Sequence, residues 1–111
     1  MMKYDIIVIG VGPAGVSACL YAKRANMKVL SLHYGTAELE KAHKIENFYG
    51  FPNGITGKNL YENGITQVKN LGVEVVEKEI IDIEVTENFS YVVKSTNETF
   101  EAKAIIIASR K

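Results

Sequence analysis

Three glycines near the start of the chain have the spacing of a phosphate-binding turn. Residues 10–15 read G-V-G-P-A-G, which fits the pattern G-x-G-x-x-G, and they follow the apolar run Tyr4–Ile9. Gly10 would let the chain bend sharply, Gly12 would let a pyrophosphate approach the backbone, and Gly15 would let the next helix pack closely on a sheet. The helix start would offer unpaired N–H groups and the positive end of its dipole. The predicted chemistry is therefore the binding of a dinucleotide's phosphates.

The elements around this turn are predicted to be a strand, a helix and a second strand. Pro13 suits the first position of a helix, and Asn26 is a plausible stop. Residues 28–33 predict the second strand, so the three elements have the size of one βαβ unit with a right-handed crossover. Apolar residues of the predicted helix that recur at helical spacing are Ala14, Ala18, Cys19, Tyr21, Ala22 and Ala25.

After the second strand the sequence predicts a long loop and a second helix. Residues 34–57 lack periodicity and are rich in turn residues, and we expect this loop to cover a ligand. Thr56 is expected to cap a helix that ends at Gly72. Gly64 inside this helix should cost about 1 kcal/mol relative to alanine, which predicts close packing on that side.

The last part of the chain predicts strands. Residues 73–77 predict a short strand beside the first two. In the next strand, 79–86, the alternation of Ile81, Ile83 and Val85 with acidic residues predicts one half-buried face. The strands expected to form an antiparallel meander are 79–86, 90–95 and 99–102, and the apolar run 104–108 is expected to be a central parallel strand.

Composition and charge restrict the possible classes of function. A chain of 111 residues predicts one domain over residues 1–111, and a formal net charge of zero gives no reason to expect nucleic acid or an anionic membrane as partner. No apolar run approaches the ~18–20 residues of a membrane span, and no signal peptide is expected. The single cysteine, Cys19, is expected to be buried, and its isolation suggests a cytoplasmic protein. His33 and His43 lack metal-ligand spacing, so no metal site is expected.

Four local patterns resemble the N-terminal FAD segment of the thioredoxin reductase-like flavoproteins, which are pyridine nucleotide-disulfide oxidoreductases with two dinucleotide-binding domains. They are the glycine turn with the helix after it, Glu38-Leu39, the run I-E-N-F-Y-G-F-P at 45–52 and the strand 104–109. The third pattern is the most specific. The resemblance implies an α/β, Rossmann-like FAD/NAD(P)-binding fold with a central parallel sheet, helices and a three-stranded antiparallel meander.

The same resemblance implies FAD as the cofactor and assigns residues to it. The glycine turn would hold the pyrophosphate, Asn47 and the Glu38-Leu39 pair would line the flavin portion, and the backbone at Glu79-Ile80 would read the adenine edge. Ala108 and Ser109 would close over the adenosine side, and His33 stands where an acidic residue often takes the adenosine ribose. The cofactor-binding residues predicted in this way are Gly10, Gly12, Pro13, Ala14, Gly15, His33, Glu38, Leu39, Asn47, Ile80, Ala108 and Ser109.

The chain also departs from the family pattern at several positions. His33 keeps one hydrogen bond but loses the bidentate contact of a carboxylate with the ribose. Glu38 stands where the family has glutamine, and Arg110 stands where the family has a glycine in a tight turn. The NADPH domain, its Cys-x-x-Cys pair and the returning C-terminal segment of the family are not in this sequence, so NADP or NAD would bind only in that missing domain.

The resemblance therefore implies the FAD-binding portion of an NAD(P)H-dependent flavoprotein oxidoreductase, an incomplete FAD domain that does not turn over by itself and has no catalytic residue of its own. Two alternatives remain open. One is a stand-alone dinucleotide-binding or interaction module with no redox activity, and the other is NAD(H) binding on the same turn. Because the segment that would cover the last strand is missing, we also expect an exposed apolar sheet face and self-association or a homodimer through it.

Overall fold

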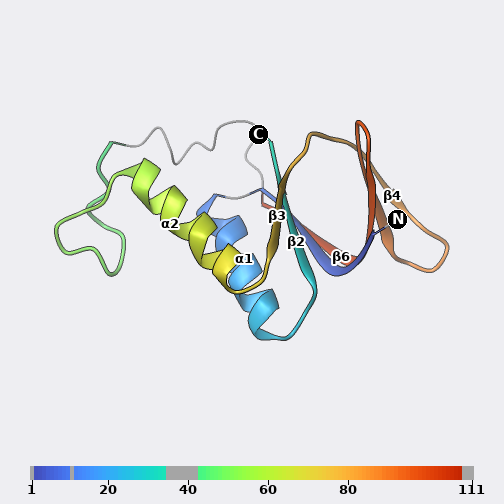
Figure 1. Ribbon diagram of the computed structural model, residues 1–111, viewed down its shortest axis with the longest axis horizontal. Coiled ribbons are helices and arrows are strands. Elements are labelled where there is room, and N and C mark those ends of the chain that lie inside the picture. The colour runs from blue at the N-terminus through green and yellow to red at the C-terminus, as the bar shows by residue number, and fades with distance from the viewer. Residues whose placement is uncertain (1, 11, 35–42, 109–111) are drawn as a thin grey trace.

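The residues that the structure describes form one six-stranded mixed sheet with two helices (Figure 1). The computed structural model describes residues 2–10, 12–34 and 43–108. The strand order is β3-β2-β1-β6-β5-β4, in which β3, β2, β1 and β6 are parallel and β5 and β4 run antiparallel to their neighbours. The expected α/β architecture is confirmed. In chain order the elements are β1 (Met2–Ile9), α1 (Pro13–Arg24), β2 (Val29–His33), α2 (Gly57–Asn70), β3 (Glu74–Glu77), β4 (Ile80–Val85), β5 (Tyr91–Ser95) and β6 (Thr99–Ile107).

The ends of both helices follow the predicted capping residues. In α1, Gly12 is the N-cap, Pro13 is the first helical residue, and Asn26 adopts a left-handed φ of 63° just past the end. In α2, the hydroxyl of Thr56 accepts a hydrogen bond from the backbone N–H of Asn59 at 3.1 Å. The helix ends before Gly72, whose φ of 93° favours glycine.

The two helices pack closely at the position that Gly64 predicts. A methyl group added at Gly64 would lie 3.3 Å from Cγ2 and 3.4 Å from Cγ1 of Val16 in α1. These distances are tighter than most contacts of real Cβ atoms, so any larger residue would push the helices apart. The prediction of close packing on this side of α2 is confirmed.

The hydrophobic core has two parts, one on each face of the sheet. The first lies between the sheet and both helices, and the second lies between the sheet and the meander, which curls over the opposite face (Figure 1). Consecutive residues of β1 alternate between them: Ile6 and Val8 face the helices, and Ile7 faces the meander. The helix-side cluster is Ile6, Val8, Cys19, Ala22, Val29, Val68 and Val73, and the meander-side cluster is Tyr4, Ile7, Leu30, Leu32, Val93, Phe100 and Ala102.

The predicted strands 99–102 and 104–108 are a single strand, which corrects the sequence interpretation. β6 runs unbroken from Thr99 to Ile107 and pairs with β1 over its whole length. It pairs with β5 only as far as Ala102. In the described chain no strand covers the β5 side of β6 beyond that point, and Ile107 is 63% exposed. The run is therefore parallel to β1 and inside the strand order, as expected, but among the described residues its last part has a paired strand on one side only.

The inward face predicted for β4 is only partly right. The alternation predicted that Ile81, Ile83 and Val85 share a buried face, but Ile81 is 60% exposed and Val85 is 65% exposed. Ile83 packs against the meander-side core as predicted, and Ile80 packs there too, because the register shifts between Ile80 and Asp82 as in a β-bulge. An extra residue in one strand reverses the face of the side chains beyond it, and a period-two pattern does not reveal it.

Three positions of the apolar face predicted for the first helix, Ala14, Tyr21 and Ala25, are exposed. Tyr21 is 76% exposed, whereas Gly15, Cys19 and Ala22 are buried. The buried stripe follows spacings of four and three residues, and Tyr21 is turned away from it by about 100°. In the described residues neither helix is long and apolar enough to cross a membrane.

Candidate nucleotide-binding site

The glycine turn is held against the carboxyl end of β2. Gly10 has a φ of 111°, a conformation that L side chains rarely adopt, and its N–H donates a hydrogen bond of 2.7 Å to the carbonyl of Leu32. Ala108 donates its N–H to the carbonyl of Ile9 at 2.8 Å. The turn therefore lies between the ends of β2 and β6, at the carboxyl edge of the parallel strands, where open α/β sheets bind ligands.

Gly12 and Gly15 have opposite surroundings. A Cβ at Gly12 would have no atom of the other described residues within 4 Å, so among these residues the backbone there faces open space. A Cβ at Gly15 would overlap the carbonyl oxygen of Gly10 and contact Cβ of Ala108 at 3.6 Å. The missing side chain at Gly15 lets α1 approach the turn, and the missing side chain at Gly12 leaves room for a group outside it. These are the two roles that a phosphate-binding turn requires.

The start of α1 favours an anion in that open space. The first intrahelical bond runs from the N–H of Val16 to the carbonyl of Gly12 at 3.0 Å, so the N–H groups of Ala14 and Gly15 precede it. Pro13 has no N–H, and no acidic residue lies in the first turn of the helix. Pro13 and Ala14 are exposed. The amides and the dipole thus meet no competing negative side chain from this turn.

His33 ends β2 one residue after the carbonyl that anchors the glycine turn. It is half-buried, and its own carbonyl accepts a hydrogen bond of 2.9 Å from the N–H of Lys78. In the parallel register between β2 and β3, His33 is the partner of Glu77, which is exposed. The glycine turn, the end of β2 and the end of β3 are therefore linked by backbone hydrogen bonds.

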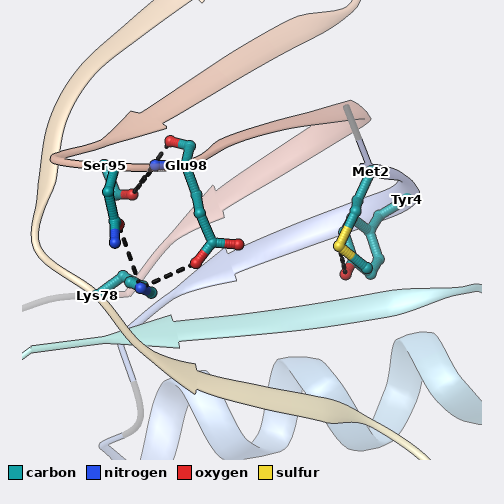
Figure 2. A network of polar contacts seen from close by, with 6 residues as sticks. Met2, Tyr4, Lys78, Ser95 and Glu98 are labelled. Carbon is teal, nitrogen blue, oxygen red and sulfur yellow. Dashed lines mark hydrogen bonds and ion pairs between the residues drawn. The ribbon is translucent and has the colours of Figure 1, made fainter.

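Lys78, directly after β3, connects this edge to the meander (Figure 2). Its ammonium forms an ion pair of 2.8 Å with Glu98 and a hydrogen bond of 3.2 Å with Oδ1 of Asn97. The hydroxyl of Ser95 donates to the carbonyl of Glu98 and accepts from its N–H, which fixes the turn between β5 and β6. The meander is thereby attached to the end of β3.

Tyr4 lies apart from these contacts, at the opposite end of the sheet from the glycine turn. Its hydroxyl donates to the sulfur of Met2 at 3.8 Å (Figure 2). Burial, followed by a hydrogen bond with Glu74 and the charge of that carboxylate, raises the pKa of Tyr4 to about 12. Negative charge on this hydroxyl is thus disfavoured, which gives Tyr4 a structural place in the core.

The only cysteine of the sequence is part of the core, as expected. Cys19 is 1% exposed and lies in the helix-side cluster. Burial raises the pKa of its thiol, although a hydrogen bond with Ser31 lowers it in part. The thiolate needed for nucleophilic or redox chemistry is therefore disfavoured.

The other predicted residues lie at different distances from the turn. Ala108 is beside it, as described above. Ile80 opens β4, where it pairs with Ser95 of β5, and its side chain packs on the meander-side core. Asn47 is exposed in the loop 43–56, which the bridge between Ile45 and Ile55 closes on itself. Glu38, Leu39, Ser109 and Arg110 lie outside the described residues.

Two parts of this arrangement were missed from the sequence. The carbonyl of Leu32 anchors the glycine turn, and no side-chain pattern reveals a backbone acceptor. The pairing of β2 with β3 places Glu77 beside His33, although the sequence had predicted only that Glu77 ends a strand at 73–77. What the sequence could not supply was the register itself.

Comparison with known proteins identifies the wider family. Residues 4–109 match the sequence model of the family Pyridine nucleotide-disulphide oxidoreductase. The chain is 36% identical over 108 residues to the thioredoxin reductase of Aquifex aeolicus, an alignment that covers 96% of this chain and 33% of that protein. It is 35% identical over 108 residues to the bifunctional thioredoxin reductase/thioredoxin of Mycobacterium leprae, covering 95% of this chain and 23% of that protein.

Solved structures give the same result. The thioredoxin reductase of Streptococcus pyogenes superposes with a TM-score of 0.87 at 31% identity, over 95% of this chain and 34% of that one. The Lactococcus lactis thioredoxin reductase has a TM-score of 0.87 at 32% identity, over 98% of this chain and 37% of that one. The chain thus spans about a third of the length of most of the thioredoxin reductases that it matches. With the family matched over nearly all of its residues, the chain belongs to the pyridine nucleotide-disulphide oxidoreductases.

Proposed function

We propose that this chain forms the part of an FAD site that holds the ADP moiety, within an NAD(P)H-dependent flavoprotein oxidoreductase of the thioredoxin reductase type. The observation that carries the proposal is the contrast between Gly12, which faces open space, and Gly15, which is closed by the carbonyl of Gly10. A turn that served only to join a strand to a helix would need a glycine at position 15 but not at position 12.

The residues present fit a dinucleotide diphosphate. The amides of Ala14 and Gly15 would donate to the phosphates beside Gly12, and Ala108 would lie on the neighbouring strand end. His33 would lie toward the ribose, and the backbone at Ile80 toward the adenine. Asn47, Glu38 and Leu39 would contact the flavin portion, and Ser109 the adenosine side. When bound, FAD would supply hydride and electron transfer, and this chain's residues would bind and orient it.

The test is direct titration of the purified chain with FAD. Dialysis against FAD, followed by a visible spectrum of the retained protein, is expected to give flavin bands in stoichiometric amount. Isothermal titration with ADP is expected to give binding at the same site, displaced by FAD. A colourless protein that also binds no ADP would contradict the proposal.

A binding module without redox activity is the second candidate, and His33 is the observation that favours it. A histidine in place of an acid removes a strong contact with the ribose hydroxyls, as it would in a site released from selection for tight FAD binding. Such a module would bind ADP and NAD(H) as well as it binds FAD. A preference for FAD over NADH in the same titration would count against it.

We also propose that the 111-residue chain does not reduce a disulfide by itself. The sequence has one cysteine, and that cysteine is buried with a raised thiol pKa, so no exchange between two thiols is available within this chain. Addition of NADPH and an aromatic disulfide is expected to release no thiolate above the rate without protein. Release at an enzymatic rate would overturn this part of the proposal.

Self-association through the exposed sheet face is a further part of the proposal. The β5 side of β6 beyond Ala102 has no partner in the described chain, and the isoleucines there, Ile106 and Ile107, are exposed. Unpaired edges with apolar side chains favour association with another strand. Light scattering across a concentration series is expected to show dimers or larger species, and Ile107→Lys is expected to shift them toward monomer.

A further inference from the structure

The end of β2 lacks a carboxylate at the point where a dinucleotide fold ordinarily places one. In such folds an acidic residue about 20 positions after the glycine turn binds the ribose hydroxyls. His33 holds that position here, and it is the last residue of β2. The adenosine ribose of the proposed ligand would therefore need an acid from another element.

The register of the sheet places an acid beside His33. β2 and β3 are parallel, and His33 is paired with Glu77, the last residue of β3. Neighbouring strands lie about 4.8 Å apart, and paired residues project from the same face. The next pair back, Ser31 and Val75, identifies that face: Val75 packs on the helix-side core, and so does Val29, two residues before Ser31 on the same strand.

Glu77 is therefore on the same face of the sheet as α1, whose first turn carries the phosphate-binding amides. Its position is fixed by the backbone, because the N–H of the next residue, Lys78, bonds the carbonyl of His33. That strand end is fixed in turn to the glycine turn, since Gly10 bonds Leu32. Two short backbone links thus connect Glu77 to the turn.

The carboxylate of Glu77 is available for a ligand. It is exposed, and within the described part of the chain it forms no ion pair or side-chain hydrogen bond. The nearest cation in sequence, Lys78, is instead paired with Glu98. At the other end of β3, by contrast, Glu74 is engaged with Tyr4.

The geometry points to Glu77 as the residue that binds the adenosine ribose, in place of an acid at the end of β2. The carboxylate accepts hydrogen bonds from the 2′- and 3′-hydroxyls, and His33 lies between it and the glycine turn. This assignment rests on the proposed function, because it requires an adenosine diphosphate group on that turn. It makes Glu77 a specificity residue for an unphosphorylated ribose, since a 2′-phosphate would meet a negative charge.

The test compares ADP with 2′,3′-dideoxy-ADP on the wild-type chain and two variants, by isothermal titration. Glu77→Gln is expected to raise the dissociation constant for ADP roughly tenfold or more, the loss typical of a hydrogen bond to a charged group. The constant for dideoxy-ADP is expected to stay the same, because it has no hydroxyls for Glu77 to bind. Glu74→Gln, which removes the same charge from the other end of β3, is expected to leave both constants unchanged.

A third variant tests whether the acid itself, rather than its strand, determines ADP affinity. His33→Asp, made in the Glu77→Gln background, puts the acid back on β2 and is expected to restore most of the ADP affinity. Circular dichroism of each variant checks that the fold is kept. If Glu77→Gln weakened the binding of ADP and dideoxy-ADP equally, or weakened neither, the assignment would be overturned while the proposed function would stand. No ADP binding by the wild-type chain would overturn both.

Discussion

Gly12→Ala and Gly15→Ala are expected to separate nucleotide binding from folding. Both changes add one methyl group to the same turn, and both replace glycine by alanine. At Gly12 the methyl enters open space, and the φ of −67° suits any residue. At Gly15 it overlaps the carbonyl of Gly10. The first variant should lose its ligand and keep its fold, and the second should lose stability.

The magnitudes follow from opposing terms at each position. At Gly12, alanine is a poorer N-cap than glycine by about 0.5–1 kcal/mol, which offsets a similar gain of ~0.4–1 kcal/mol from restricting the unfolded chain. The net change in the free energy of unfolding is therefore near zero. At Gly15, alanine gains about 1 kcal/mol of helix propensity, but overpacking costs about 1–3 kcal/mol, and more where the obstacle is backbone.

The assays are thermal unfolding and titration with ADP. Gly12→Ala is expected to melt within a few degrees of the wild type and to raise the dissociation constant for ADP at least tenfold, about 1.4 kcal/mol. Gly15→Ala is expected to lower the melting temperature by roughly 4–8 °C for each kcal/mol lost. Undiminished ADP binding by a folded Gly12→Ala variant would refute the reasoning, because the methyl group would then stand where the phosphates were placed.

Three further changes test the fold around the site. Gly64→Ala should not give the ~1 kcal/mol by which alanine ordinarily stabilises a helix relative to glycine, because the added Cβ would lie 3.3 and 3.4 Å from the methyl groups of Val16, which is held in one rotamer. A full stabilisation of ~1 kcal/mol in urea unfolding would contradict this packing. Thr56→Ala should lower the free energy of unfolding by about 1 kcal/mol through loss of the N-cap bond to Asn59, and Thr56→Ser, which keeps that bond, should not. The raised pKa of Tyr4, about 12, means that the folded state holds the hydroxyl proton more tightly than the unfolded chain, whose tyrosine has a pKa of 10.0. The contribution of Tyr4 to stability should therefore be fully present below pH 10 and be lost between pH 10 and 12, and Tyr4→Phe should flatten that part of the measured curve.

The sequence predicted best where one local rule determines the structure. The glycine turn, Pro13 at the helix start and the Thr56 cap each depend on residues only a few positions apart, and each was found where expected. Close packing on one side of the second helix was also predicted, because Gly64 has little other reason to interrupt a helix, and the structure shows that the partner is Val16 of the first helix. Most of the elements that position the site could be predicted from the sequence in this way.

The errors arose where distant parts of the chain decide the outcome. The face of Ile81 depends on a bulge in β4 relative to β5, so this side chain points outward although its pattern predicts burial. The exposure of Ile107 depends on which strand lies beside β6, and the apolar residues next to Ile107 in the sequence do not indicate which strand that is. In the site, Glu77 became a candidate only through its register with β2. Pairing between strands is the information that local periodicity lacks.

The unbroken course of β6 has a consequence for how the chain acquires its structure. β1 is made first, yet one of its two neighbours is β6, so the sheet stays open along β1 until synthesis has passed Ile107. Contacts between such distant segments carry a large loop-closure entropy and slow the folding of a domain. A nascent chain emerging from the ribosome would therefore expose this edge of β1 until β6 has been made, and an exposed strand edge favours association with other chains.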